Sequence, residues 1–389
     1  MAEQEQDAIF SRYGLKFNPF PPAATGVAIV RNLWLPDSWK QDLTQRYLQL
    51  AASRGDRAMA IVGAYGSGKT YALSWIAEQL LRDDGWQTFK FDNPGLAFYD
   101  LANRLLRRVG RYELAKGLWE LLSAQNPELK GNSGQLISPS FSDWLALVKT
   151  RTARDQFLPR LTGAIKSASL TDDEEIAHRV ARIIVETGDR PYFEYRDFVA
   201  GRPGSLVAEQ EEAAYFKTLI RMLDGVYGGK GVAFLIDEFE DVALQKRLNR
   251  KQSHEYMATL RRLLDATNQE NFLVIVSMTP EAYVQTISID PSLEQRFVSP
   301  WRVPELTGND AGRLVQHRLE EAREEPRDGL WPFADNALDG IGPTTVSSPR
   351  RLIRVFWQAL ATAVQTNTDP PISDDDLRLA EQAAYPASA

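Results

Sequence analysis

The chain has 389 residues, 43% of them hydrophobic and 25% charged, with a formal net charge of −7 at pH 7. This is the composition of a globular protein with about two or three compact units, and the acidic balance argues against a nucleic-acid binder that is basic all over. The absence of cysteine excludes disulfides, thiolate catalysis and thiolate metal sites.

Three further features narrow the possible functions. The histidines His178, His254 and His317 lie far apart without ligand spacing, so we expect neither a zinc site nor a histidine-based triad. No apolar run approaches the ~20 residues that cross a bilayer. The first seven residues are acidic and polar, unlike a signal peptide. We therefore expect a cytoplasmic protein without a membrane partner.

The N-terminal region is predicted as a linker followed by a helix. Residues 1–35 are proline-rich without clear periodicity, and we expect an ordered linker whose aromatic side chains pack on the core. Pro36, Asp37 and Ser38 signal the start of a helix that runs to about Ser53. We assign residues 1–57 to this linker and helix.

A phosphate-binding loop follows the short apolar run Ala58–Val62. The loop matches G-x-x-x-x-G-K-[ST] with the residues Gly63, Ala64, Tyr65, Gly66, Ser67, Gly68, Lys69 and Thr70. Its glycines allow positive φ, so that backbone N–H groups can cradle phosphate oxygens. We predict that Lys69 reaches the β- and γ-phosphates of ATP and that Thr70 binds Mg²⁺. The helical periodicity after Thr70 favours this motif over a glycine-rich turn.

A basic stripe is predicted on the next helix. After a second strand candidate at 87–92, a helix from about Leu96 to Val109 carries arginines at i, i+3, i+4 and i+7: Arg104, Arg107, Arg108 and Arg111. This stripe is either an ordinary solvated face or a set of candidate DNA contacts that bind backbone phosphates. We assign residues 58–111 to the first part of a nucleotide-binding core.

Residues 112–205 look like a separate helical insertion, interrupted by glycine-containing loops at 131–134 and 201–204. Residues 171–174 read as a capping box, begun by Thr171, that opens a helix to about Thr187. No catalytic constellation is evident here. Such an insertion on a nucleotide-binding core is more often a partner-binding or specificity element than a catalytic one.

A second decisive motif is a pair of carboxylates that directly follows another apolar run. Val232–Ile236 is entirely apolar, which is typical of a strand buried on both faces of a parallel sheet, and Asp237 and Glu238 follow directly. Carboxylates at this position lie where open α/β sheets bind ligands. Asp237 is predicted to hold Mg²⁺ through water, and Glu238 to orient and polarise the attacking water. Glu240 and Asp241 are expected in the next loop.

A second basic cluster and another buried strand come next. The cluster consists of Lys246, Arg247, Arg250 and Lys251. Like the stripe, it is either a solvated face or a further set of candidate DNA contacts. Residues 271–280 read as a buried strand that ends in hydroxyl residues.

The order of these motifs resembles that of the AAA+ ATPases, with the phosphate loop as Walker A and the Asp-Glu strand as Walker B. The resemblance implies an α/β P-loop NTPase fold: a parallel five-stranded sheet, flanking helices, the insertion and a C-terminal helical lid. It also implies a sensor 1 residue, either Thr279 or, as second candidate, Ser277. Residues 292–297 resemble the arginine-finger segment, which implies that Arg296 acts at the γ-phosphate of a neighbouring subunit.

The C-terminal region is similar to the AAA+ lid. Residues 298–303 would form the last core strand, residues 304–323 resemble the start of the lid, and residues 347–354 are similar to sensor 2, with Arg350 as the matching arginine. Alternatively, Arg296 is a surface residue and Arg350 caps a helix. The implied segments are a second core part at 206–304, a lid at 305–365 and a tail at 366–389.

Within AAA+, short motifs at 18–20, 237–240 and 349–353 resemble the branch of origin-recognition, transposition-regulator and BREX-type phage-defence ATPases. This implies an enzyme that hydrolyses ATP, assembles into a ring or filament, and acts on double-stranded DNA in phage defence or mobile-element control. An effector protein, nuclease-like or transposase-like, is expected at the insertion. The insertion is larger than usual, and the roughly 25 residues after the lid are too few for the winged helix of origin-recognition proteins.

Two other functions fit the same motifs. One is an ATP-driven switch or scaffold that regulates a protein partner through the insertion without touching DNA. The other is a small-molecule kinase, which the water-activating pair Asp237 and Glu238 and the two-arginine pattern disfavour.

Overall fold

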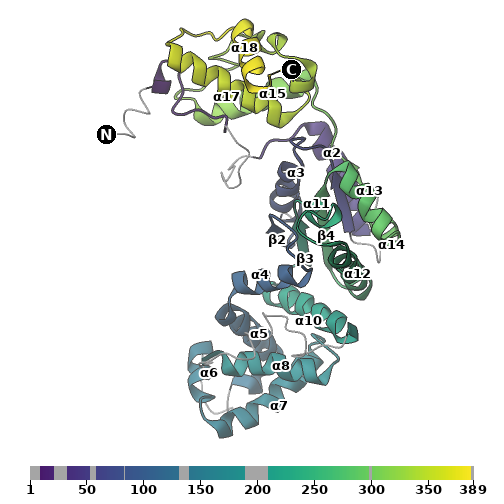
Figure 1. The fold of residues 1–389 in the computed structure, drawn as a ribbon. Helices are drawn as coiled ribbons and strands as arrows, with labels where there is room; N and C mark the ends of the chain where they lie inside the picture. The colour runs from purple at the N-terminus through teal and green to yellow at the C-terminus, as the bar shows by residue number, and fades with distance from the viewer. Residues whose placement is uncertain are drawn as a thin grey trace. The chain divides into compact units, whose positions relative to one another are not determined.

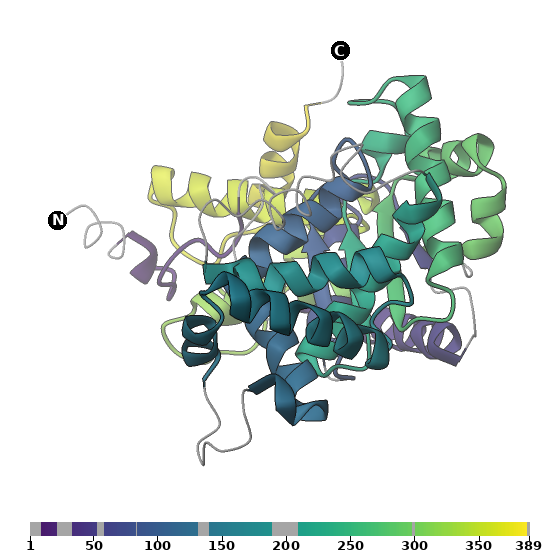
Figure 2. The same ribbon diagram turned by 90° about the horizontal axis from the view of Figure 1, so that it is seen from below.

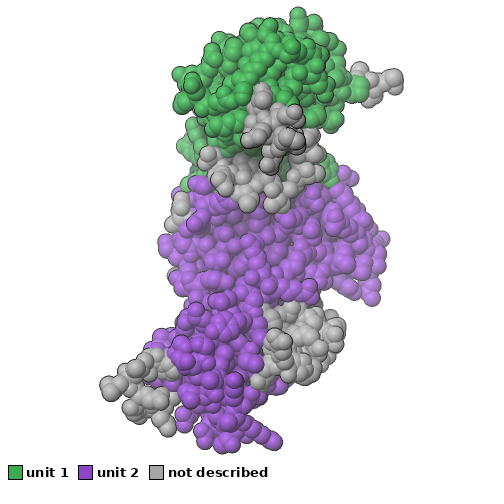
Figure 3. Space-filling model, turned by 90° about the vertical axis from the view of Figure 1, so that its left-hand side faces the viewer, with its two compact units in different colours: residues 1–45, 61–75, 301–389 green, residues 46–60, 76–300 purple. Residues whose placement is uncertain are grey.

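The computed structural model of the chain describes residues 9–21, 33–52, 58–82, 84–130, 140–188, 209–297 and 300–386. The acidic N-terminus, part of the predicted linker, the two glycine-containing loops and residues 298–299 of the expected last strand lie outside these ranges. The chain divides into two compact units (Figure 3). Unit 1 comprises residues 1–45, 61–75 and 301–389, and unit 2 comprises residues 46–60 and 76–300.

Five strands form one parallel sheet in the order β2-β3-β4-β1-β5. They are β1 (Ala58–Val62), β2 (Gln87–Phe91), β3 (Val232–Ile236), β4 (Phe272–Met278) and β5 (Trp301–Arg302). Every residue of β1, β3 and β4 is buried, which explains why these segments read as unbroken apolar runs. The parallel five-stranded sheet and its flanking helices confirm the predicted α/β fold class.

Unit 2 holds β2, β3 and β4 with the helices that cover them. Phe234 on β3 is the centre of an aromatic core, because its ring centre lies 5.1 Å from that of Phe272 and 5.2 Å from that of Phe91. Edge-to-face pairs of this kind contribute about 0.5–1.5 kcal/mol each beyond the area they bury. The helices around this core are α10 (Glu209–Tyr227), α11 (Glu240–Ala243), α12 (Arg250–Ala266), α13 (Pro280–Ile289) and α14 (Ser292–Arg296).

The insertion, also in unit 2, is a bundle of short helices that follows α4 (Tyr99–Val109). They are α5 (Arg111–Gln125), η2 (Pro127–Lys130), α6 (Phe141–Leu147), α7 (Arg151–Ser167), α8 (Glu174–Val185) and η3 (Glu186–Gly188). α5 packs against α8 and α10, and α7 packs along α8. Within unit 2, α4 and α10 lie between these helices and the strands (Figure 1), and Figure 2 shows the insertion helices nearest the viewer.

Two predictions about helices in unit 2 are wrong, although α4 ends at Val109 as expected. The four arginines of the basic stripe do not share one helix, because Gly110 ends α4 with φ +81 and Arg111 opens α5. The N-cap of α8 is Asp173, whose side chain accepts a hydrogen bond from the backbone N–H of Ile176 at 2.9 Å. Thr171 instead accepts from the N–H of Asp173 at 3.2 Å and forms a turn before the helix.

The segment after the Asp-Glu pair also differs from the prediction. Glu240 and Asp241 form the first turn of α11 and are buried, whereas the sequence predicted a loop for them. A four-residue helix is too short for a periodic apolar pattern to reveal it.

Unit 1 holds the phosphate loop and the C-terminal helices. It includes α3 (Lys69–Trp75), the start of α2 (Asp37–Ala52), α15 (Gly308–Ala322), η4 (Ala337–Gly340), α16 (Pro343–Val346), α17 (Pro349–Thr366) and α18 (Asp374–Ala384). α3 continues into the π-helical turn η1 (Ile76–Leu81) of unit 2. α18 falls in the segment expected to be a tail and packs along α17.

The aromatic residues of the N-terminal segment pack on the C-terminal helices rather than on the sheet. The ring centre of Phe20 lies 5.5 Å from that of Phe356 on α17 and 6.1 Å from that of Phe333. The Tyr13 hydroxyl donates to the carbonyl oxygen of Thr368 at 2.8 Å. This segment covers an apolar face that the lid helices present. Across the described ranges, every helix is too short or too polar to cross a membrane.

Candidate nucleotide-binding site

In unit 1, the phosphate loop connects β1 to α3 and is shaped by its glycines. Gly66 and Gly68 have φ of +78 and +102, a region that side chains rarely adopt. A Cβ on Gly66 would lie 2.7 Å from the Cβ of Arg350, and one on Gly63 would lie 2.4 Å from the Oγ of Ser67. Glycine is therefore needed at these positions of the motif, because a side chain would have an unfavourable φ or would collide with a neighbouring side chain.

Two polar side chains of the loop face its interior. Lys69 is buried, and its Nζ donates to the carbonyl oxygens of Gly63 at 3.0 Å and Ala64 at 3.2 Å. The Oγ of Ser67 is buried and has no hydrogen-bond partner among the described residues. A buried hydroxyl without a partner is costly. Thr70 lies exposed on the first turn of α3.

The structure brings Arg350 to the phosphate loop within unit 1. α17 begins at Pro349, and the backbone N–H of Arg350 donates to the carbonyl oxygen of Gly66 at 3.2 Å. The side chain of Arg350 is exposed, so its guanidinium can move toward a ligand in the loop. The first turn of the lid helix is thereby tied to the loop.

Sequence reasoning missed a second arginine, Arg318 of α15. Its Nη2 donates to the hydroxyl of Tyr71 at 2.9 Å, and its guanidinium lies 5.4 Å from the centre of that ring. Tyr71 directly follows Thr70, so this contact ties a second lid helix to the start of α3. Arg318 is buried on the same helical stripe as Leu314 and Leu319, and an arginine inside an apolar stripe is the signal that could have revealed it.

In unit 2, Asp237 and Glu238 follow β3 as predicted. Asp237 is buried, and its backbone N–H donates to the carbonyl oxygen of Phe91 at 2.9 Å. Its Oδ1 accepts hydrogen bonds from the backbone N–H of Glu238, at 3.0 Å, and from the hydroxyl of Ser277. These contacts fix the orientation of the aspartate. Glu238 has φ +51, and its side chain is exposed.

The surroundings of Glu238 raise the pKa of its carboxyl. Although the side chain is largely exposed, partial desolvation of the carboxyl has the largest effect, and the negative charges of Asp237, Asp241 and Glu240 add to it. Arg247 acts in the opposite direction and lowers the pKa of Glu238. Arg247 itself pairs with Asp241, at 3.0 Å between Nε and Oδ2. A carboxylate with a raised pKa binds a proton more readily, which suits a general base.

The two hydroxyl candidates at the end of β4 have different roles. Ser277 donates to Asp237 in the buried interior. Thr279 is the N-cap of α13, and its Oγ1 accepts a hydrogen bond from the backbone N–H of Ala282 at 3.2 Å. Thr279 was the first candidate, but Ser277 is the residue brought to the carboxylates. Pro280 at the first helical position was the signal that marks Thr279 as a cap.

Arg296 lies at the end of α14 and is held within its own unit. Its Nη2 lies 2.6 Å from Oδ1 of Asp265 on α12, and its Nη1 donates to the carbonyl oxygen of Ser292 at 2.8 Å. The ion pair between Arg296 and Asp265 would have to break before Arg296 could reach a nucleotide on another subunit.

The structure brings together some residues of the basic stripe and of the second basic cluster. Arg104 and Arg107 from α4 and Arg247 from the segment after α11 line one cavity of about 460 Å³ in unit 2. Arg104 donates to the carbonyl and side-chain oxygens of Asn93, at 3.1 and 3.0 Å. The other candidate DNA contacts do not line this cavity: Arg108, Arg111, Lys246, Arg250 and Lys251.

No protein-family model matches the chain, and no curated protein matches it. Solved structures of the ORC2 protein of Aeropyrum pernix are similar to it at 14% identity. The form with ADPNP and ADP has a TM-score of 0.48 over 95% of this chain and 72% of that one. The ADP form has a TM-score of 0.47 over 93% and 71%.

The ORC1 protein of the same organism, solved in complex with DNA, has 11% identity and a TM-score of 0.45 over 92% of this chain and 68% of that one. These likenesses assign neither a family nor an activity to the chain.

Proposed function

We propose that the chain is an ATPase that binds ATP with Mg²⁺ at the phosphate loop and hydrolyses it with Glu238 as general base. The observation that carries the proposal is the state of Glu238: an exposed carboxylate beside buried Asp237, with φ +51 and a raised pKa. A residue strained in this way costs about 1–3 kcal/mol and persists where the surrounding structure enforces it, often at active sites.

The phosphate loop fits the phosphates of a nucleotide. Phosphate oxygens would accept the hydrogen bond that the buried Ser67 hydroxyl lacks, and Lys69 would supply positive charge. The Thr70 hydroxyl and the Asp237 carboxylate suit Mg²⁺, which proteins usually hold with one or two carboxylates together with substrate phosphates. When bound, Mg²⁺ would neutralise charge on the β- and γ-phosphates.

The proposed reaction needs one base and several cations. Glu238 accepts a proton from water while the water oxygen bonds to the γ-phosphorus, and the bond to the bridging oxygen breaks, with its electron pair leaving on ADP. Lys69, Arg350 and Arg296 of the neighbouring subunit balance the charge on the transferred phosphoryl group. Ser277 keeps Asp237 in position and takes the sensor 1 role in place of Thr279.

Glu238→Gln tests the hydrolysis half of the proposal. The amide keeps the size of the side chain but cannot accept the proton, so kcat should fall by about 10²–10⁴-fold while ATP binding is retained. Lys69→Ala should instead weaken ATP binding itself. Glu281→Gln, an exposed glutamate on α13, is the matched control. Hydrolysis by Glu238→Gln at the wild-type rate would refute the assignment.

The finer proposal is that the ATPase is a cytoplasmic homo-oligomer, a ring or filament, that acts on double-stranded DNA in phage defence or mobile-element control. The cavity shared by Arg104, Arg107 and Arg247 supports a phosphate contact, because Arg107 is exposed and without an ion-pair partner among the described residues.

The DNA test is the binding of duplex DNA to the ATP-bound Glu238→Gln protein across a salt series. Affinity should fall steeply with salt, and Arg107→Ala should reduce the slope by about one. Lys149→Ala, which changes an exposed cation on the insertion, should leave the slope unchanged. Binding that is absent or insensitive to salt contradicts the DNA half of the proposal.

One observation favours a second candidate, an ATP-driven switch or scaffold that regulates a protein partner without direct DNA contact. The insertion carries a pocket of its own, lined by α5, η2 and α6 and separate in sequence from every nucleotide-site residue. Both functions place the effector protein, nuclease-like or transposase-like, at the insertion. They differ in whether DNA changes the rate of hydrolysis.

A further inference from the structure

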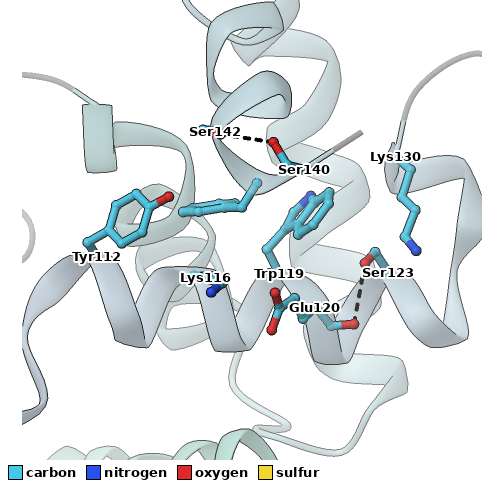
Figure 4. Close-up of a pocket in the computed structure, with 9 residues that line it drawn as sticks. Tyr112, Lys116, Trp119, Glu120, Ser123, Lys130, Ser140 and Ser142 are labelled. Carbon is cyan, nitrogen blue, oxygen red and sulfur yellow. Dashed lines mark hydrogen bonds between the residues drawn. The ribbon is translucent and has the colours of Figure 1, made fainter. Parts of the chain in front are cut away.

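A pocket of about 410 Å³ lies within the insertion (Figure 4). It is lined by five residues of α5, by the end of η2 and by the start of α6: Tyr112, Lys116, Trp119, Glu120, Ser123, Lys130, Ser140, Phe141 and Ser142. Its volume is within the range of sites that bind small ligands or a few side chains.

The wall of the pocket is aromatic and holds an unused hydrogen-bond donor. The Trp119 ring is 3% exposed, and its centre lies 5.6 Å from that of Phe141 and 5.8 Å from that of Trp144. Its Nε1–H is buried without a hydrogen-bond partner among the described residues. Figure 4 shows Trp119 extending from α5 toward Ser140. A buried indole N–H normally finds an acceptor, so this one calls for an acceptor from a ligand.

Two lysines supply positive charge to the pocket. Lys116 and Lys130 are half-buried and form no ion pair within the described part of the chain. The sequence 131–139, which connects Lys130 to Ser140, contains no charged residue and so brings no carboxylate to them. Among the described residues that line it, the pocket therefore has two cations without an ion-pair partner, hydroxyl groups and an apolar wall, with Glu120 as the one anion.

We propose that this pocket binds a short acidic segment of a partner protein, with one apolar or aromatic side chain against the aromatic wall. Carboxylates of the segment pair with Lys116 and Lys130, a carbonyl oxygen accepts from Trp119, and backbone N–H groups donate to Glu120. The inference rests on the proposed function only in taking the insertion as the partner-binding element.

Nucleic acid suits the same pocket less well. Base stacking needs an open ring face, and Trp119 is buried among other rings. Glu120 can accept hydrogen bonds from the backbone N–H groups of a peptide, whereas a phosphate backbone has no such donors. The hydrogen-bond acceptor Glu120 and the burial of Trp119 together favour a peptide.

The test uses the full chain and four fluorescein-labelled pentapeptides of the form Asp-Glu-x-Asp-Glu, where x is Leu, Phe, Tyr or Trp. We expect saturable binding of at least one peptide by fluorescence anisotropy. The neutral Asn-Gln-x-Asn-Gln counterpart should bind at least about tenfold more weakly, because it lacks the charges that pair with the lysines. Absence of saturable binding by all four acidic peptides overturns the proposal, as does equal binding of the neutral form.

Matched variants assign the binding to the pocket. The double change Lys116→Ala and Lys130→Ala should weaken binding by at least about tenfold, and Trp119→Phe, which removes the N–H donor together with part of the indole ring, by about three- to tenfold. Lys149→Ala, an exposed lysine of the same insertion outside the pocket, should change nothing. Unchanged binding in the double variant, or displacement of the peptide by single-stranded DNA at equal charge, overturns the proposal.

Separate measurements of peptide binding and of ATP hydrolysis distinguish the failure of this proposal from the failure of the proposed ATPase function. Peptide binding is measured without nucleotide, and the hydrolysis rates of the pocket variants should equal the wild-type rate. A chain that binds peptide but does not hydrolyse ATP refutes the ATPase alone. A chain that hydrolyses ATP but binds no peptide refutes the pocket alone.

Discussion

The phosphate loop of unit 1 and the carboxylates of unit 2 are built in different ways. The loop is shaped by its own residues, since Gly66 and Gly68 supply the positive φ and Lys69 bonds to carbonyl oxygens of the same loop. The carboxylates depend on neighbours distant in sequence, since Ser277 orients Asp237 from 40 residues away. The backbone of the loop is thus set mainly by consecutive residues, with one distant contact from Arg350, whereas the carboxylate pair depends on the strand beside it.

The largest expected effect concerns Arg296, which we propose acts on the nucleotide of a neighbouring subunit. Arg296→Ala should lower hydrolysis by about 10³–10⁵-fold, because in the proposed mechanism it removes a cation that acts on the nucleotide of the neighbouring subunit. Glu238→Gln should be nearly inactive for a different reason, because it lacks the proton acceptor. Mixing the two inactive proteins one to one should restore about a quarter of the wild-type rate, since half of the subunits keep Glu238 and half of those face an intact Arg296.

The mixing experiment is measured by steady-state phosphate release after the subunits exchange. The control mixes untagged Arg296→Ala with tagged Arg296→Ala. This mixture should stay inactive. If the mixture of Arg296→Ala and Glu238→Gln shows no gain over its components, the trans role of Arg296 is wrong. The ion pair with Asp265 is then a purely structural contact.

The next largest effect tests whether the loop is fixed by its backbone. In Gly66→Ala the added Cβ would lie 2.7 Å from that of Arg350 at φ +78, so both strain and collision oppose the native loop. We expect ATP affinity to fall at least about 100-fold, measured by calorimetry, because the cradle must deform to accept a side chain. Gly110→Ala is the control, since its φ is +81 but no atom lies within 4 Å of the added Cβ. Equal loss of ATP affinity in both variants would show that the effect of Gly66→Ala is not specific to the phosphate loop.

The sequence was sufficient for the parts of the site whose chemistry is local. The phosphate loop, the apolar strand before Asp237 and the resulting sheet follow from consecutive residues, because glycine spacing and apolar runs have direct structural meaning. Ser277 and Thr279 could not be ranked in the same way. Both are hydroxyl residues at one strand end, and only the position of β3 beside β4 determines which of them meets Asp237.

The sequence analysis did not predict two other features correctly, for related physical reasons. Arg318 occupies a helix position that reads as an apolar stripe, and the Tyr71 hydroxyl that binds it is 247 residues away in sequence. The basic stripe was wrong at Arg111, which lies beyond the helix end at Val109. Gly110 turns the chain there with φ +81, so Arg111 begins α5.

A smaller effect compares the two hydroxyl residues directly. Ser277→Ala should slow hydrolysis by about tenfold, because Asp237 loses a charge-assisted hydrogen bond that orients it. Thr279→Ala should leave kcat nearly unchanged but lower the free energy of unfolding by about 0.5–2 kcal/mol, the usual cost of losing an N-cap. Each variant is the control for the other in paired rate and denaturation measurements. The opposite pattern would restore Thr279 as the sensor.

The smallest expected effect concerns the carboxylates and pH. Glu238 must be ionised to accept a proton, and its pKa is already raised by burial and by Asp237, so hydrolysis should decline as pH falls through that raised pKa. Arg247 lowers the pKa of Glu238, so Arg247→Ala should raise that pKa and move the acidic limb of the kcat profile to higher pH.

Because Arg247 is exposed, salt should screen this influence, and the wild-type and Arg247→Ala limbs should converge at high ionic strength. Arg250→Ala, an exposed arginine that has no part in the pKa shift of Glu238, should leave the limb in place. A shift of the limb to lower pH in Arg247→Ala would mean that Glu238 is not the group that titrates. The raised pKa and strained backbone of Glu238 would then have to be explained by packing against α11 alone.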